Sequence, residues 1–232
     1  MIALKLYFAP GSCSRATLIA LEETGVPYEA QAVAFMHYEQ GSPEYLALNP
    51  KGKVPLLLAD GKPITETVAI MGWLAETYPE AKLLPRTETP YHQAQIIGDL
   101  AWASSALHAL IARLRFPMMF TDKPEAYEGV FTMASAAMAR NFSIIETRLA
   151  GRDWWHGDWS VQDAYLYWVW TRAADAGFDA APYKNFNAHV ARMTARPSVQ
   201  RALARETQGD AELAERGAAF TIPAFKSGAA GS

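Results

Sequence analysis

The stretch KLYFAPGSCSRATLIALEETG, residues 5–25, joins a short alternating segment to a helical one. The alternating residues ALKLYF, 3–8, predict a β-strand. Residues 14–24 predict a helix, which Gly25 ends and Pro27 follows, as is typical of helix C-termini. A strand, a turn and a helix in this order indicate the start of an α/β domain.

The turn within this stretch holds the only cysteine of the chain, Cys13, between Ser12 and Ser14. A cysteine at the first turn of a helix meets free N–H groups and the positive end of the helix dipole. Such a thiol is expected to have a lowered pKa and to be a better nucleophile. The alternatives are that Cys13 is a small apolar filler and that the serines only cap the helix.

The rest of the first eighty residues continues the α/β pattern. Residues 28–35 alternate with period two and predict a second strand, and residues 54–60 predict a buried one. Asp60-Gly61 is a strong hairpin signal that leads into another short strand. The segment 67–78 predicts a helix, which Pro79 ends. We therefore expect a small α/β domain with a mixed sheet.

The remainder of the chain is expected to be helical. The stretch PEAKLLPRTETP, 79–90, is rich in proline and polar residues and indicates a linker. Long amphipathic segments follow at 91–114, 126–150 and 160–176, and two short helices fit on either side of Arg196-Pro197. The expected organisation is a first domain at 1–79, a linker at 80–90, a helical domain at 91–206 and a partly mobile tail at 207–232.

The composition excludes several classes of function. The 232 residues are 50% apolar with a net charge of −3, and no basic cluster suited to nucleic acid is present. No apolar run approaches the roughly 18 residues of a membrane span, and the first residues do not have the pattern of a secretory signal. A single cysteine fits a reducing, cytoplasmic location. The five histidines show no metal-ligand spacing, so we expect no metal.

Two further motifs lie in the predicted α/β domain. In NPKGKVP, 49–55, a proline opens a buried strand after a turn, so the Val54-Pro55 bond is a candidate cis peptide. That geometry would present the Val54 main chain to an extended peptide. Glu66 and Thr67 begin a helix whose N-terminus suits a carboxylate, while Glu66 suits an ammonium group. An ordinary turn and a plain helix start are the alternatives.

Three features of the helical part complete the set. Ser160 and Asp163 have the spacing of a capping box, which we assign to folding. His108 lies on a largely apolar helix, where a histidine is a core or interface residue unless the helix faces Cys13. The stretch LRFPMMF, 114–120, offers methionine and aromatic surface for a hydrophobic pocket, or else helix-end packing; its candidate pocket residues are Phe116, Met118 and Met119.

Together these motifs resemble the cytosolic glutathione S-transferases. The segments KLYFAPGSCSRATLIALEETG, NPKGKVPLLLADGKPITETVAI and GDWSVQDAYLY occur in the family's order and spacing, and PGSCS and SSALH look most like the bacterial beta class. The resemblance implies an α/β plus all-α architecture: a thioredoxin-like N-terminal domain and a C-terminal helical bundle domain. It also implies glutathione as co-substrate, a hydrophobic electrophile as second substrate, and a homodimer.

The resemblance also implies roles for individual residues. Cys13 would lie beside the glutathione sulfur and be able to form a mixed disulfide, and His108 matches a histidine near that sulfur. Other classes use a tyrosine or a serine there, and Tyr7 and Ser12 fall close to those positions; we rank Tyr7 low. A lysine usual after the second strand is absent, which leaves His37 as the candidate for the glycyl carboxylate. The implied glutathione-binding residues are His37, Lys53, Val54, Pro55, Glu66 and Thr67.

Three hypotheses follow. The first is a transferase that binds glutathione as a thiolate and attacks a hydrophobic electrophilic small molecule. The second is a monothiol disulfide reductase that uses Cys13, because the chain has no second cysteine. The third is a non-catalytic protein that binds glutathione or another ligand.

Overall fold

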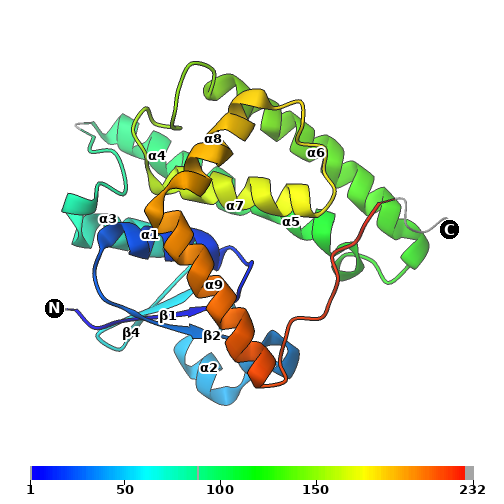
Figure 1. Ribbon diagram of the computed structural model, residues 1–232, viewed down its shortest axis with the longest axis horizontal. Coiled ribbons are helices and arrows are strands. Elements are labelled where there is room, and N and C mark those ends of the chain that lie inside the picture. The colour runs from blue at the N-terminus through cyan, green and yellow to red at the C-terminus, as the bar shows by residue number, and fades with distance from the viewer. Residues whose placement is uncertain (1, 88, 228–232) are drawn as a thin grey trace. The chain divides into compact units, whose positions relative to one another are not determined.

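The computed structural model describes residues 2–87 and 89–227, which divide into two compact units (Figure 1). The first unit combines the chain up to Leu84 with Ala195–Ile222. The second combines Pro85–Thr194 with the chain from Pro223. Each unit is described by itself below.

A four-stranded mixed sheet forms the centre of the first unit. Its strand order is β2-β1-β3-β4, with β1 parallel to β2 and antiparallel to β3, and β3 antiparallel to β4. Leu6 at the middle of β1 is fully buried and lies opposite Ala30 on one side and Leu57 on the other. The strands are β1 (Leu4–Phe8), β2 (Glu29–Ala32), β3 (Leu56–Ala59) and β4 (Lys62–Thr65).

Four helices belong to the same unit. In Figure 1, α1 and α3 run on one side of the sheet and α2 on the other. Helix α1 contacts both α3 and α9, which explains why Ala16, Leu18, Ile19, Ala20 and Leu21 are all fully buried. The helices are α1 (Ser14–Thr24), α2 (Pro43–Leu48), α3 (Thr67–Thr77) and α9 (Pro197–Glu215).

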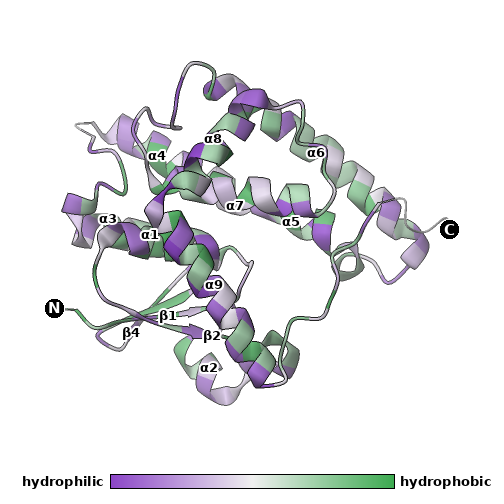
Figure 2. Cartoon of the chain, in the orientation of Figure 1, coloured by the Kyte–Doolittle hydropathy of each residue, from purple (hydrophilic) through white to green (hydrophobic). Residues whose placement is uncertain are grey.

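Helix α9 differs from the expectation for the end of the chain. It has 19 residues, so residues 207–215 are helical where the sequence analysis expects a tail, and it packs on α1 and β2 rather than within the helical part. A stripe of buried residues explains this: Ala202, Glu206, Gly209 and Leu213 recur every three to four positions. Figure 2 shows the corresponding alternation of hydrophilic and hydrophobic residues along α9. Of the expected tail, residues 228–232 lie outside the described residues.

Two strands are shorter than the sequence pattern indicates. Strand β3 begins at Leu56 instead of Val54, because Pro55 has no N–H to contribute to the sheet. Strand β2 ends at Ala32, after which the Val33 N–H donates to the Phe8 carbonyl at 2.8 Å and the chain turns away from the sheet. Strand β1 and helices α1 and α3 agree with the expected bounds to within one residue, whereas α2 has no counterpart among the predicted elements.

The second unit is helical, and α7 is its central element. Every residue from Val161 to Val169 is buried, because α7 is contacted by α4 and α5. Its helices are α4 (Pro90–Trp102), α5 (His108–Arg115), α6 (Tyr127–Arg148), α7 (Val161–Asp175) and α8 (Lys184–Ala195). Short 3-10 helices occur at Phe35–His37, Glu39–Gly41 and Pro79–Ala81 in the first unit and at Pro117–Met119 and Pro124–Ala126 in the second.

The long helix expected at 91–114 is interrupted. A π-helical turn at Ala103–Leu107 separates α4 from α5. The hydroxyls of Ser104 and Ser105 both donate to the Ala101 carbonyl, at 3.1 and 2.8 Å. Serine hydroxyls that bond to the preceding turn compete with the regular helical pattern and bend it. The turn ends immediately before His108.

The predicted capping box is confirmed. Ser160 and Asp163 form it at the start of α7, and the Asp163 carboxylate accepts the Ser160 N–H at 2.9 Å. The same carboxylate accepts the Trp155 N–H and bonds to Nε2 of His189, each at 2.9 Å. All these contacts are buried, so Asp163 ties three segments of the second unit together.

Candidate active site

The turn that carries Cys13 is held mainly by Ser12. The Ser12 hydroxyl donates to the Ala9 carbonyl at 2.7 Å, and its oxygen accepts the Ser14 N–H at 3.2 Å. The Arg15 N–H donates to the Ser12 carbonyl at 3.1 Å. The N–H groups of Ser14 and Arg15 therefore have acceptors on Ser12, although Cys13 and not Ser12 is the N-cap residue of α1. A hydroxyl has one proton, and that of Ser12 is directed at the Ala9 carbonyl, so Ser12 is poorly placed to donate to the sulfur of a bound ligand.

Cys13 is buried, and its pKa shift is the reverse of the expected one. Its side chain is 7% exposed, with Sγ at 3.8 Å from the Val54 carbonyl oxygen. Burial raises the pKa of the Cys13 thiol to about 11, and the nearby Glu66 carboxylate adds to the rise. The Thr67 hydroxyl and the Cys13 backbone act in the opposite direction but do not cancel it. The expectation of a lowered pKa is therefore wrong, since the cost of desolvating the thiolate exceeds the benefit of the helix end.

The raised pKa predicts how stability depends on alkaline pH. The folded protein keeps Cys13 protonated, whereas the unfolded chain releases this proton above its ordinary pKa of about 8.5. The contribution is therefore fully present at neutral pH and is lost as pH rises towards 11. Between about pH 8 and about pH 10, Cys13 should cost the wild type about 1–2 kcal/mol of unfolding free energy. Urea unfolding of the wild type and Cys13→Ala at both pH values checks this, and parallel losses would contradict it.

The loop before Pro55 brings the Val54 main chain to Cys13. The Val54-Pro55 peptide bond is cis, as predicted. The carbonyl of Val54 faces Cys13, and within the described residues its N–H donates to no protein acceptor. Lys53 in the same loop is exposed. A loop N–H that has no protein acceptor among the described residues suits an extended peptide ligand, whose main chain can accept it.

Glu66 and Thr67 lie at the start of α3, next to this loop. Thr67 is buried and interacts with the Cys13 thiol, while Glu66 is exposed. Glu66 has a φ of 75°, a backbone conformation that non-glycine residues rarely adopt. Its carboxylate accepts a hydrogen bond from Nζ of Lys51 at 2.6 Å. The Lys51 ammonium therefore occupies the position predicted for the ammonium group of a ligand. The structure thus brings together Cys13, Val54, Glu66 and Thr67.

A buried carboxylate from α9 holds the Cys13 turn from behind. Glu206 is 4% exposed; it accepts the Gly11 N–H at 2.8 Å and pairs with Nε of Arg15 at 2.8 Å. Gly209, one turn further, has no side chain, and a Cβ there would lie 2.8 Å from the Phe8 ring. No local motif points to Glu206, because its partners lie 195 and 191 residues away. The only available signal is its place on the apolar stripe of α9.

The remaining candidates are His37 and Tyr7 in the first unit and His108 in the second. His37 is exposed in the 3-10 helix Phe35–His37. Tyr7 on β1 packs edge-on against Tyr45, with ring centroids 5.7 Å apart. In the second unit, Nδ1 of His108 lies 3.1 Å from the Tyr165 hydroxyl, and the His108 ring contacts Trp168. The roles of His37 and His108 stay predictions.

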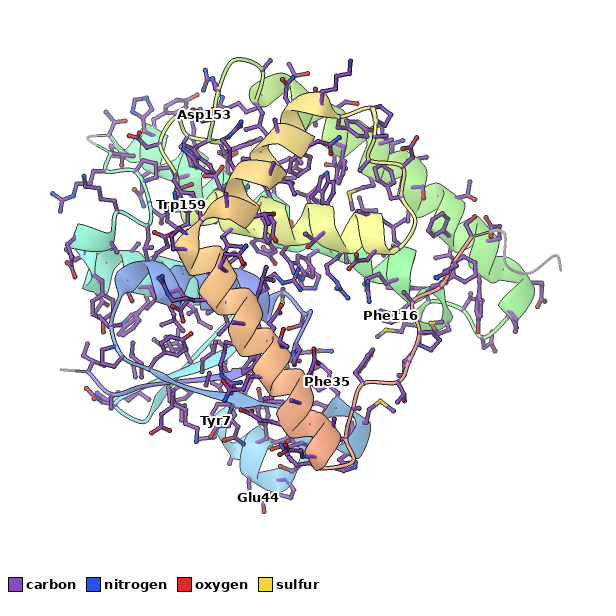
Figure 3. All side chains as sticks on the ribbon, in the orientation of Figure 1. Tyr7, Phe35, Glu44, Phe116, Asp153 and Trp159 are labelled. Atoms are coloured by element: carbon purple, nitrogen blue, oxygen red, sulfur yellow. The ribbon has the colours of Figure 1, made fainter. Side chains whose placement is uncertain are left out.

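The candidate residues for a hydrophobic pocket, Phe116, Met118 and Met119, lie where α5 ends. Phe116, labelled in Figure 3, caps α5, and Met118 and Met119 follow it with 37% and 70% exposure. The N–H of Phe225 donates to the Arg115 carbonyl at 2.8 Å, so the C-terminal segment runs beside the end of α5. An exposed methionine pair next to aromatic rings suits a hydrophobic ligand, and the assignment stays a prediction.

Two further properties concern residues 2–87 and 89–227: the absence of a membrane-spanning helix and of a metal-binding cluster. None of these helices combines the length and apolar content needed to cross a membrane. Within the same residues, no three histidine, cysteine, aspartate or glutamate side chains are grouped so as to hold a metal ion.

Comparison with known proteins identifies the family. The family model described as "Glutathione S-transferase, N-terminal domain" matches residues 11–77. Glutathione S-transferase GstA of Escherichia coli O157:H7 is 33% identical over 207 residues, which are 88% of this chain and 98% of that protein. A beta class glutathione S-transferase from Sphingomonas chungbukensis has a TM-score of 0.76 at 32% identity, covering 87% of this chain and 98% of the other.

The structure of a third relative contains a ligand. The structure of a sphingomonad glutathione S-transferase complexed with glutathione has a TM-score of 0.76 at 31% identity, covering 88% of this chain and 98% of the other. The expected fold, a thioredoxin-like domain followed by helices, is confirmed by these matches and by the mixed sheet. The chain therefore belongs to the glutathione S-transferase family of enzymes, and it is most like the bacterial beta class.

Proposed function

We propose that this enzyme binds glutathione at the cluster of Cys13, Val54, Glu66 and Thr67 and joins it to a hydrophobic electrophilic small molecule. The observation that carries the proposal is the convergence of three different groups within the first unit. The Val54 main chain suits a peptide backbone, Glu66 suits an ammonium group, and the buried Cys13 thiol lies beside both. Glutathione has each of the complementary groups.

Binding would exchange one ion pair for another. The Lys51 ammonium occupies Glu66, and both side chains are more than half exposed, so the contact is weak and readily replaced. The amine of the γ-glutamyl group would take the place of Lys51, and its carboxylate would meet the N-terminus of α3. His37 and Lys53 remain our candidates for the other carboxylate.

The chemistry would be an attack by the glutathione sulfur. With a pKa of about 11, the Cys13 thiol stays protonated at neutral pH, and on binding its single proton would turn from the Val54 carbonyl, 3.8 Å away, to the glutathione sulfur. A donor beside the glutathione sulfur favours its thiolate form. The thiolate then forms a carbon–sulfur bond with the electrophile, and either a leaving group departs with the bond electrons or the electrophile takes up a proton. Phe116, Met118 and Met119 are the candidates for the surface that binds the electrophile.

The same raised pKa weighs against the monothiol reductase. A reductase needs Cys13 as an attacking thiolate, and burial disfavours that form. Our proposal therefore makes Cys13 a donor in conjugation.

Parallel assays of conjugation and disulfide reduction test the proposal. One follows glutathione conjugation to a chloronitrobenzene, and the other follows reduction of a mixed disulfide of glutathione. The wild type should conjugate. Cys13→Ser keeps a hydroxyl donor and should retain more conjugation than Cys13→Ala, which should lose about tenfold in kcat/KM. His108→Ala tests the predicted contribution of His108 in the same assay.

Intact mass after exposure to oxidised glutathione gives an independent readout. The folded protein should gain the glutathione adduct more slowly than the denatured protein, since its thiolate is disfavoured. Faster modification when folded, together with disulfide reduction that depends on Cys13, would replace our proposal with the reductase. Absence of glutathione binding and turnover in both assays would leave a ligand-binding protein.

A further inference from the structure

Two buried side chains converge on the main chain immediately before Val54. The Tyr45 hydroxyl donates to the Lys53 carbonyl oxygen at 2.8 Å, and Nδ2 of Asn49 donates to the same oxygen at 2.7 Å. Tyr45 is 4% exposed and Asn49 is 1% exposed. A peptide unit is planar, and its C=O and N–H point in opposite directions. The two donors that hold the Lys53 carbonyl therefore also fix the direction of the Val54 N–H.

Tyr45 is itself held rigidly by its surroundings. It lies on α2, where the Ser42 oxygen caps the helix by accepting the Tyr45 N–H at 3.1 Å. Its ring meets that of Tyr7, labelled in Figure 3, at an interplanar angle of 89°. Tyr45 also belongs to a hydrophobic cluster with Val33 and Leu56. Only the hydroxyl reaches out of this cluster, towards Lys53.

Asn49 closes the loop from the end of α2. Its N–H donates to the Tyr45 carbonyl at 2.8 Å, and its Oδ1 accepts the Lys51 N–H at 3.2 Å. The amide group thus bridges Lys51 and Lys53 and uses both of its ends. Rotation of the side chain would break one of these bonds, so the Nδ2 donor has a single position.

Tyr45 remains a donor over the whole working pH range. Burial raises its pKa well above the ordinary value, although the Asn49 side chain acts in the opposite direction. The phenol therefore keeps its proton and cannot serve as a base. The hydroxyl proton is used in the hydrogen bond to the Lys53 carbonyl.

We infer that Tyr45 and Asn49 are positioning residues for glutathione, acting through the Val54 peptide. Both side chains bond to the Lys53 carbonyl, and through this peptide unit they hold the Val54 N–H in the direction in which a ligand main chain can accept it. The inference rests on the proposed binding of glutathione at Val54. It adds two residues that hold the binding surface in place before the substrate arrives, which lowers the ordering cost of binding.

The variants Tyr45→Phe and Asn49→Asp test this inference. Tyr45→Phe keeps the ring and removes the hydroxyl, so one of two bonds to the Lys53 carbonyl is lost. We expect KM and the calorimetric Kd for glutathione to rise about three- to tenfold, as the loss of one hydrogen bond allows. Asn49→Asp keeps Oδ1 for the Lys51 N–H but removes the Nδ2 donor, and should raise both values about tenfold or more. At saturating glutathione, kcat and KM for the electrophile should stay within about twofold of the wild type.

Tyr28→Phe is the matched control. Tyr28 belongs to the same unit, and its hydroxyl donates to Glu22 at 2.6 Å, so the substitution removes the same atom and one hydrogen bond elsewhere. It should lower the thermal midpoint about as much as Tyr45→Phe and leave KM for glutathione unchanged. If the Tyr45 hydroxyl were purely structural, Tyr45→Phe would lower the thermal midpoint without raising KM for glutathione, as Tyr28→Phe is expected to do.

Four results would overturn the inference. Equal midpoints for the two phenylalanine variants with unchanged KM for glutathione would make Tyr45 structural only, while the transferase function stands. Equal changes in kcat and in both KM values would indicate general distortion of the site. If the wild type conjugates and Asn49→Asp binds glutathione as tightly as the wild type does, the main-chain contact lies elsewhere. A wild type that does not bind glutathione at all would instead refute the proposed function, and with it the inference.

Discussion

Glu206→Gln is expected to lower the unfolding free energy by about 2–4 kcal/mol, because it removes the negative charge that pairs with the partly buried Arg15 guanidinium. The Arg15 and Glu206 side chains are only 12% and 6% exposed, so water does not replace the lost partner. Urea unfolding at neutral pH measures the change. Glutamine keeps one oxygen that can accept the Gly11 N–H, so the Cys13 turn should loosen only in part, and kcat/KM for conjugation should fall less than stability does.

A second ion pair of the same helix supplies the control. Arg201 pairs with Glu22 at 2.6 Å and is 54% exposed, so Arg201→Gln should cost at most about 1 kcal/mol. Equal losses for Glu206→Gln and Arg201→Gln would contradict the prediction. In the double variant Glu206→Met/Arg15→Met, both charges are gone, and much of the stability should return. Activity should be lower there than in Glu206→Gln, since methionine offers no oxygen in place of the one that accepts the Gly11 N–H.

Asp163→Ala is expected to cost about 3–5 kcal/mol, or to prevent folding, because four buried donors lose their acceptor together. These donors are the N–H groups of Trp155 and Ser160, the Ser160 hydroxyl and Nε2 of His189. Asp163→Asn keeps the shape and one oxygen, and should remain foldable at a smaller cost. Thermal and urea unfolding of both variants check the order.

Ser160→Ala separates the cap from the rest of this network. It removes one member of the capping box and should cost about 1 kcal/mol. If Asp163→Ala lost no more than Ser160→Ala, the links to Trp155 and His189 would contribute nothing. If it lost several times more, Asp163 would be the centre of the second unit's polar core.

Local signals in the sequence predict much of the fold. Helix α1 begins and ends at the expected residues, Ser14 and Thr24, because Gly25 provides the left-handed C-cap. The cis bond before Pro55 and the capping box at Ser160 are likewise present. Each of these depends on residues that are neighbours in the chain.

The features that the sequence does not predict depend on distant contacts. The pKa of Cys13 follows from burial beside Val54 and Thr67, some 40 and 54 residues further along, and a local helix-end argument gives the wrong sign. The place of α9 in the first unit follows from a buried stripe within a polar segment. Tyr45 and Asn49 gain their significance only because the loop folds back to bring Lys53 to both.

The two-part composition of the first unit has a consequence for synthesis of the chain. The ribosome completes the sheet and its flanking helices α1 to α3 long before it makes α9. Gly11 and Glu206 are separated by 195 residues, so at typical elongation rates the Cys13 turn waits roughly 10–40 s for its carboxylate. Until then the side of α1 that α9 contacts in the folded protein stays uncovered. The nascent chain therefore completes the hydrogen bonds of the Cys13 turn only after its last helix has been released.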